Sequence, residues 1–95
     1  MGDTALYLAV DRGHTYTAKA LLELGAEVNT ANLGGWTPLM MAAAQGNLET
    51  IELLLQWGAD FRPINRWGAT ALSEARKSFR SAQAADLLIR AGATE

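Results

Sequence analysis

A short motif recurs along this 95-residue chain at a constant spacing, and this repetition constrains the fold more than any other feature. The letters GDTALYLA occupy residues 2–9, GWTPLMMA occupies 35–42 and GATALSEA occupies 68–75, so successive copies begin at equal intervals. Glycine, threonine, leucine and alanine fall at the same places in all of them. A fixed period of about 20–50 residues is typical of architectures in which similar units stack in a row.

A second motif repeats beside the first. LLELGAE occupies residues 21–27, LLQWGAD occupies 54–60 and LIRAGA occupies 88–93. The last copy comes one residue late, which predicts a different turn around Phe79 in the third unit. We therefore interpret the chain as one domain, residues 1–95, with repeats at about 1–31, 32–64 and 65–95.

Each unit carries the local signals of two helices. Thr4, Thr37 and Thr70 stand just before apolar patterns, where a hydroxyl can accept a hydrogen bond from the first helical turn. Leu6 and Ala9 are three residues apart and therefore share one helix face. Glycines follow the apolar runs and can end the helices in a left-handed conformation. We expect first helices at about 5–12, 38–45 and 71–78, second helices at about 15–24, 48–57 and 81–91, and projecting turns at about 26–36 and 59–69.

The best copy of the motif, WTPLMMAA at residues 36–43, resembles the ankyrin repeat, whose signature is a β-turn and two helices with a TPLHxA run. The resemblance covers essentially the whole chain. It implies an all-α ankyrin-repeat solenoid of stacked antiparallel helix pairs joined by projecting β-turn or hairpin loops. The family's histidine is replaced by Tyr7, Met40 and Ser73, so the hydrogen bonds of that histidine should be absent or replaced.

The two ends of the stack should differ, because an end repeat needs a polar outer face. The third repeat carries Arg76 and Glu74 where the first repeat has Val10 and Leu8, so it is predicted to be a cap. The first repeat keeps an apolar face that includes Leu6, Leu8 and Val10. We expect either that the chain is the C-terminal part of a longer array or that a partner covers this face. The alternative is a self-sufficient protein of three repeats.

The family resemblance implies a binding surface on the concave side, made by the turn tips and the exposed faces of the first helices. Tryptophan and arginine dominate interface hot spots, and an exposed apolar patch marks an interaction site. The alternative is that the tryptophans pack over the adjacent turn. The predicted partner-binding residues are Leu33, Trp36, Ile64, Arg66 and Trp67 in the turns and Asp11, Arg12, Gln45 and Lys77 on the first helices.

These features predict a protein–protein interaction module that binds a segment with a hydrophobic anchor. Arg66, Lys77 and Arg62 should favour acidic groups at one end of the surface. The alternative function is a structural or regulatory ankyrin segment of a longer multidomain protein. Asn29 follows Glu27-Val28 in a context that resembles the asparagine hydroxylated in some ankyrin arrays, although an asparagine here can simply satisfy turn backbone groups.

Catalytic and metal chemistry is not expected. The chain has no cysteine and one histidine, His14, which cannot build a usual zinc site or a Ser-His-Asp triad. We therefore expect no enzyme, no metal and no cofactor. The net charge of −2 does not favour nucleic acid, and no apolar run is long enough to span a membrane. We expect an intracellular protein, cytoplasmic or nuclear, that is a monomer or makes contacts through the apolar face of repeat one.

Overall fold

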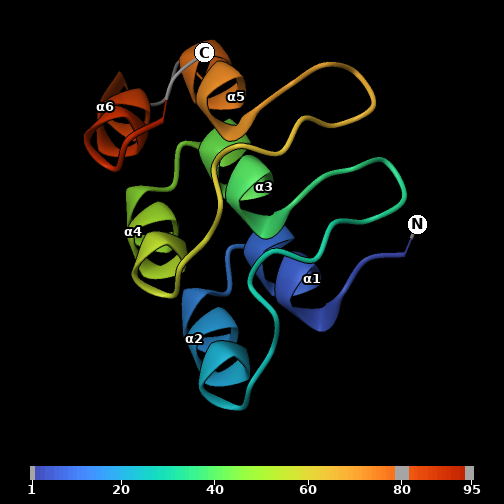
Figure 1. Cartoon of the computed structure of the whole chain (residues 1–95). Coiled ribbons are helices and arrows are strands. Elements are labelled where there is room, and N and C mark those ends of the chain that lie inside the picture. Colours follow the sequence, from blue (N-terminus) through green and yellow to red (C-terminus); the bar gives the residue numbers. More distant parts are fainter. Residues whose placement is uncertain (1, 79–81, 94–95) are drawn as a thin grey trace.

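The computed structural model describes residues 2–78 and 82–93, and within them the chain forms stacked pairs of antiparallel helices. Figure 1 shows α1, α3 and α5 in one row, α2, α4 and α6 in a second row, and long turns that project from the stack. The helices are α1 (Ala5–Asp11), α2 (Thr15–Glu23), α3 (Pro38–Gln45), α4 (Leu48–Gln56), α5 (Ala71–Lys77) and α6 (Ala82–Arg90).

This arrangement confirms the expected all-α solenoid, and the predicted helix ends agree to within one residue wherever the structure describes them. Each helix pair lies within one of the proposed repeats, whose boundaries stay a proposal. The different turn predicted around Phe79 lies outside the described residues.

Threonine begins each first helix as expected. Thr4, Thr37 and Thr70 each accept a hydrogen bond from the backbone N–H three residues later, over 3.0, 3.2 and 3.1 Å. In the third helix pair, the Ser73 hydroxyl also accepts a bond from the Thr70 N–H at 2.8 Å, which completes a capping box. Gly46 ends α3 with φ of +67°, in the left-handed region that glycine tolerates.

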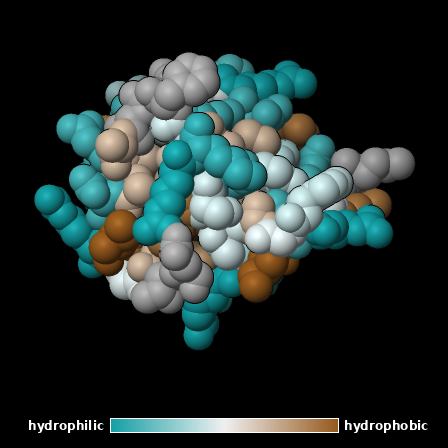
Figure 2. Space-filling view, turned by 90° about the horizontal axis from the view of Figure 1, so that it is seen from above, coloured by the Kyte–Doolittle hydropathy of each residue, from teal (hydrophilic) through white to brown (hydrophobic). Residues whose placement is uncertain are grey.

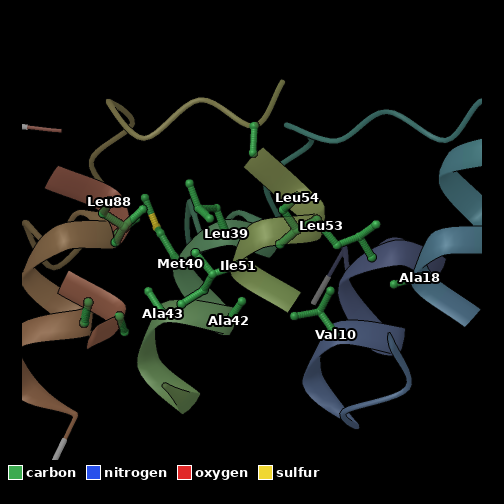
Figure 3. Packing of buried hydrophobic residues seen from close by; sticks show 14 of the residues in the cluster. Val10, Ala18, Leu39, Met40, Ala42, Ala43, Ile51, Leu53, Leu54 and Leu88 are labelled. Atoms are coloured by element: carbon green, nitrogen blue, oxygen red, sulfur yellow. The ribbon is translucent and has the colours of Figure 1, made fainter. Parts of the chain in front are cut away.

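The core lies between the two rows of helices and runs through the whole stack. Ala42 and Ala43 are fully buried, and their small size lets neighbouring helices approach closely. Leu54 and Leu88 occupy equivalent positions in α4 and α6, and both are fully buried (Figure 3). Burying such a side chain stabilises the fold by about 1.5–3 kcal/mol. Most of the stability of these short helices therefore comes from packing between repeats.

The position of the family's histidine is filled differently in each repeat. Tyr7 and Met40 are buried in the core, whereas Ser73 joins the capping box at the start of α5. The first two replacements exchange polar contacts for apolar packing. The third keeps a hydrogen bond to the backbone at the start of its own helix.

The first repeat exposes less apolar surface than expected. Leu6 and Val10 are each only 1% exposed, and Val10 lies in the core beside α3 (Figure 3). Their inclusion in an open apolar face was wrong, because these side chains point into the stack. Leu8 is exposed, and Leu21 is partly buried whereas its equivalent, Leu54, is fully buried. The open side of the first repeat thus includes Leu8 and Leu21.

The opposite end is formed by α5 and α6 and carries mostly hydrophilic residues, with hydrophobic ones in small separate patches (Figure 2). Arg76 is exposed there, as the prediction of a polar cap requires. Glu74 does not belong to this polar face, because its side chain is largely buried and forms an ion pair with Lys77 at 3.3 Å. The pair neutralises a carboxylate at a position where the other repeats have leucine or methionine.

Candidate functional site

The two turns between helix pairs are held rigid by backbone hydrogen bonds. Each is closed on itself by an N–H···O bond, from Asn32 to Trp36 at 3.0 Å and from Asn65 to Ala69 at 2.9 Å. A further bond joins the two turns, because the Arg66 N–H donates to the Gly34 carbonyl at 3.0 Å. The turn tips are therefore a fixed surface and not independent loops.

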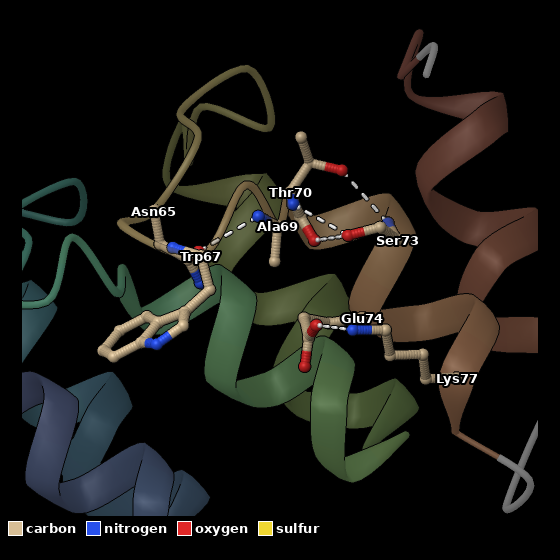
Figure 4. Close-up of polar contacts among 7 residues, drawn as sticks. All are labelled: Asn65, Trp67, Ala69, Thr70, Ser73, Glu74 and Lys77. Carbon is tan, nitrogen blue, oxygen red and sulfur yellow. Dashed lines mark hydrogen bonds and ion pairs between the residues drawn. The ribbon is translucent and has the colours of Figure 1, made fainter.

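Two equivalent asparagines fix the shape of these tips. The Asn32 Oδ1 accepts bonds from the N–H groups of Gly34 and Trp36, each at 3.0 Å. The Asn65 Oδ1 accepts from Trp67 and Ala69 at 2.9 and 3.0 Å (Figure 4). Neither asparagine was among the predicted site residues, although their equivalent places in successive repeats were a usable signal.

The side-chain amide nitrogens of these two asparagines differ in their hydrogen-bond partners. The Asn32 Nδ2 donates to Asp3 Oδ1 at 2.9 Å, which links the first turn to the segment that precedes α1. The Asn65 side chain is 5% exposed, and its Nδ2 has no hydrogen-bond partner. The position equivalent to Asp3 in the next repeat is Trp36, which offers no carboxylate. An unsatisfied buried donor costs about 1–3 kcal/mol, and this cost offsets part of the stability that Trp36 contributes by packing against the core.

Large apolar side chains stand out from the tips. Leu33, Ile64 and Trp67 are 68%, 67% and 74% exposed. Trp36 is partly buried and packs against the core, which agrees with the packing role considered as the alternative for it. The Trp67 ring also touches the adjacent turn, since a Cβ added at Gly34 would lie 3.0 Å from its Cζ3. The indole of Trp67 is thus both seated on a turn and open to solvent.

The predicted residues of the first helices differ in their availability. Asp11 and Arg12 are exposed, whereas the Gln45 Nε2 donates to the Asp11 carbonyl at 2.8 Å and ties α3 to α1. Lys77 is exposed, but its ammonium is already engaged with Glu74. These residues lie at or just after the C-terminal ends of α1, α3 and α5, where Gln45 also has a structural role.

The cations predicted to attract acidic groups are not equivalent. Arg62 forms an ion pair with Asp60 at 3.0 Å, and this contact lowers the pKa of the aspartate and raises the pKa of the arginine. Lys77 is paired with Glu74. Arg66 is exposed and has no ion pair within the part of the chain that the structure describes. Among these three cations, Arg66 is the best placed to meet an acid.

Comparison with known families decides what this scaffold is. A family model of ankyrin repeats in many copies matches residues 5–55, and a second model of three ankyrin repeats matches residues 31–94. The chain belongs to the ankyrin repeat family. The stacked helix pairs, the threonine caps and the projecting turns of this ankyrin domain agree with that assignment.

Two curated relatives resemble part of this ankyrin chain. Protein phosphatase 1 regulatory subunit 12A from Mus musculus is 45% identical over 38 residues, and the same protein from Rattus norvegicus matches equally well. The match covers 40% of this chain and 4% of each relative. The chain therefore spans only a small fraction of the length of these relatives.

Asn29 connects the two turns from the other side of the stack. Its Oδ1 accepts a hydrogen bond from the Asp60 N–H at 2.7 Å, between residues that are far apart in the sequence. This bond satisfies a turn backbone group, which is the alternative considered for Asn29. The side chain is exposed, and hydroxylation of Asn29 stays a prediction.

Tyr7 is the titratable side chain whose ionisation the ankyrin fold changes most clearly. Burial raises the pKa of Tyr7 to about 12, and the negative charges of Asp3 and Asp11 contribute to the increase. The phenol is therefore neutral at physiological pH and acts as a packing group. It gives no indication of acid–base chemistry.

Other surfaces of the ankyrin stack carry no recognisable site. A groove of about 290 Å³ between α2 and α4 is lined by Tyr16, Lys19, Glu52 and neighbouring residues, and it was not predicted. Within residues 2–78 and 82–93, no group of three acidic or histidine side chains could hold a metal ion. In the same residues, no helix is long and apolar enough to cross a membrane.

Proposed function

We propose that this ankyrin domain is a non-catalytic module that binds a partner protein through its turn tips and the adjoining faces of the first helices. The observation that carries this proposal is the exposure of Leu33, Ile64 and Trp67, each about two-thirds or more accessible, on turns that hydrogen bonds hold rigid. Because hydrogen bonds already fix the backbone of these turns, little backbone freedom is lost when a partner binds. We therefore assign the main contact to the tips.

The unpaired amide of Asn65 supports the same surface. Trp36 stands where an aspartate would satisfy this amide, as Asp3 does for Asn32. A side chain that leaves a buried donor without a partner is easier to understand if it serves recognition, since functional sites are where local rules of folding are broken. We assign Trp36 to the edge of the contact surface, where it supports the exposed Trp67.

The remaining predicted residues form the rim of this surface. Asp11, Arg12 and Lys77 are exposed at the C-terminal ends of the first helices, so they would adjust orientation and association rate more than affinity. The cysteine-free sequence is the basis on which we propose an intracellular setting. The partner itself is proposed only as a protein with an apolar anchor.

A pull-down from native lysate tests this function with a matched control. Trp67→Ala removes an exposed tip side chain, and Leu24→Ala removes a similarly exposed apolar side chain at the end of α2, where Leu24 is 85% exposed. Proteins retained by the wild type and by Leu24→Ala should be lost from Trp67→Ala. Equal retention by all three chains would exclude the turn tips as the binding surface.

A second candidate is a regulatory segment of a larger protein, without a ligand of its own. The observation that favours it is the similarity to regulatory subunits of which this chain spans only 4%. In that case, substitutions on the open side of the first repeat should disturb function more than substitutions at the tips. Leu8→Asp compared with Trp67→Ala in the full-length protein separates the two candidates.

A further inference from the structure

The Trp67 indole packs on Gly34, where any side chain would contact the ring. A Cβ at Gly34 would lie 3.0 Å from Trp67 Cζ3, 3.2 Å from Trp67 Cη2 and 3.3 Å from Trp36 Cδ1. At these distances, the neighbouring ring atoms would have to give by a few tenths of an ångström. Both tryptophans therefore contact Gly34, and the Trp67 ring occupies space that a side chain at position 34 would fill. We call this contact the seat of Trp67.

The backbone beneath this seat is independently fixed. The Gly34 carbonyl accepts the Arg66 N–H at 3.0 Å, and the Trp67 N–H donates to Asn65 Oδ1 at 2.9 Å. Backbone groups on both sides of the contact are thus held while the indole itself is 74% exposed. A large exposed aromatic side chain normally samples several rotamers, and its immobilisation on binding costs free energy. Here, the contact with Gly34 already restricts the Trp67 ring before any ligand binds, so less freedom is lost on binding.

We propose that Gly34 is a positioning residue that holds Trp67 in an orientation ready for binding, and that the surface takes a peptide segment with an apolar side chain next to a carboxylate. This inference rests on the proposed function. The apolar side chain would pack on the exposed Trp67. The carboxylate would meet Arg66, the neighbour of Trp67, whose guanidinium has no ion pair among the described residues.

Alanine at position 34 separates this role from a role in folding. Gly34 does not have a left-handed φ, so alanine is compatible with its backbone conformation. The neighbouring atoms in the way are the outer edges of two indole rings and not backbone atoms. Gly34→Ala should therefore fold with an unfolding midpoint close to that of the wild type while the Trp67 ring is displaced.

The experiment uses peptides selected from a random display library on the wild-type chain, with affinities measured by fluorescence anisotropy. Gly34→Ala should weaken binding of a selected peptide by about twofold to tenfold, the range expected for one side chain that loses its preorganisation. The same substitution should have no effect in a Trp67→Leu background, which keeps an apolar side chain but lacks the ring. In NMR spectra, the ring-current shift of the Gly34 α-protons should disappear in Trp67→Leu.

The possible failures can be told apart. If the wild type enriches no peptide, the proposed function fails. If peptides bind but Gly34→Ala matches the wild type, or weakens binding equally in Trp67→Leu, then the positioning role of Gly34 is wrong. Arg66→Gln should weaken binding of a peptide with the carboxylate and leave its amide counterpart unchanged. Equal effects on both peptides would overturn the assigned ligand chemistry.

Discussion

Asp3, which precedes α1, accepts a hydrogen bond from Asn32 in the first turn. Replacing Trp36 by aspartate should recreate this bond one repeat later, with Asn65 in the second turn as the donor. That bond is 2.9 Å long, whereas the equivalent Asn65 Nδ2 is buried and has no partner. The aspartate would stand at the place in the second repeat that Asp3 occupies in the first, in a turn whose backbone stacks on its neighbour. The substitution tests whether the Asn65 amide lacks a partner because Trp36 stands where the first repeat has Asp3.

The size of the effect follows from comparing Trp36→Asp with Trp36→Ala. Both variants lose the packing of the indole, which costs about 3–5 kcal/mol for a fully buried aromatic and roughly half of that for the partly buried Trp36. Only the aspartate can accept a bond from Asn65, and a hydrogen bond to a charged group contributes about 1.5–3 kcal/mol. At the lower end of this range, Trp36→Asp should be the more stable variant by about 1.5 kcal/mol.

Urea unfolding followed by far-ultraviolet circular dichroism measures this difference without relying on tryptophan fluorescence. An aspartate at 36 also precedes α3, where the helix dipole can contribute about 0.3–1 kcal/mol. Trp36→Asn controls for this, because its side-chain oxygen can accept the bond from Asn65 without carrying a charge. Trp36→Asn should therefore still be more stable than Trp36→Ala, by about 0.5–1.5 kcal/mol. If Trp36→Asp is no more stable than Trp36→Ala, the assigned origin of the unpaired amide is refuted.

Three further predictions concern the scaffold. The pKa of Tyr7 is raised in the folded state, so its contribution to stability is complete below the unfolded value of about 10 and is lost as the pH rises towards about 12; an alkaline unfolding titration should show this loss, and Tyr7→Phe should remove its pH dependence. Gln45→Ala breaks the bond to the Asp11 carbonyl and should lower the free energy of unfolding by about 0.5–1.5 kcal/mol in urea titrations. Thr70→Ala removes half of the capping box and should cost about 1 kcal/mol, measured by thermal unfolding; an unchanged midpoint would show that Ser73 caps the helix alone.

Much of the scaffold could be predicted because its signals are local. Thr37 caps α3 and Gly46 ends it because of their own backbone preferences and their spacing along one helix. Leu54 and Leu88 stand at the same position in successive repeats, and both are buried. An interpretation of one repeat therefore applies to the equivalent residues of the next. The constant period of the first motif and the nearly constant period of the second were therefore sufficient to predict the helices, their pairing and the family.

The candidate site was predicted only in outline, because burial there depends on which side chain the neighbouring turn presents. Trp36 and Trp67 are both tryptophans in turns, yet Trp36 packs against the core and Trp67 is open. Which of them would be open was not evident from spacing, since the place of the Trp67 ring depends on its contact with Gly34 in the preceding turn.

Sequence patterns were sufficient to predict a stack of ankyrin repeats and the turns that project from it. The tertiary structure decided which residues are available there. In it, Val10 and Leu6 are buried in the core, Lys77 is paired with Glu74, and the amide of Asn65 has no acceptor. The physical reason is that helix formation depends on neighbours along the chain, whereas exposure and hydrogen-bond partners depend on neighbours in the adjacent repeat.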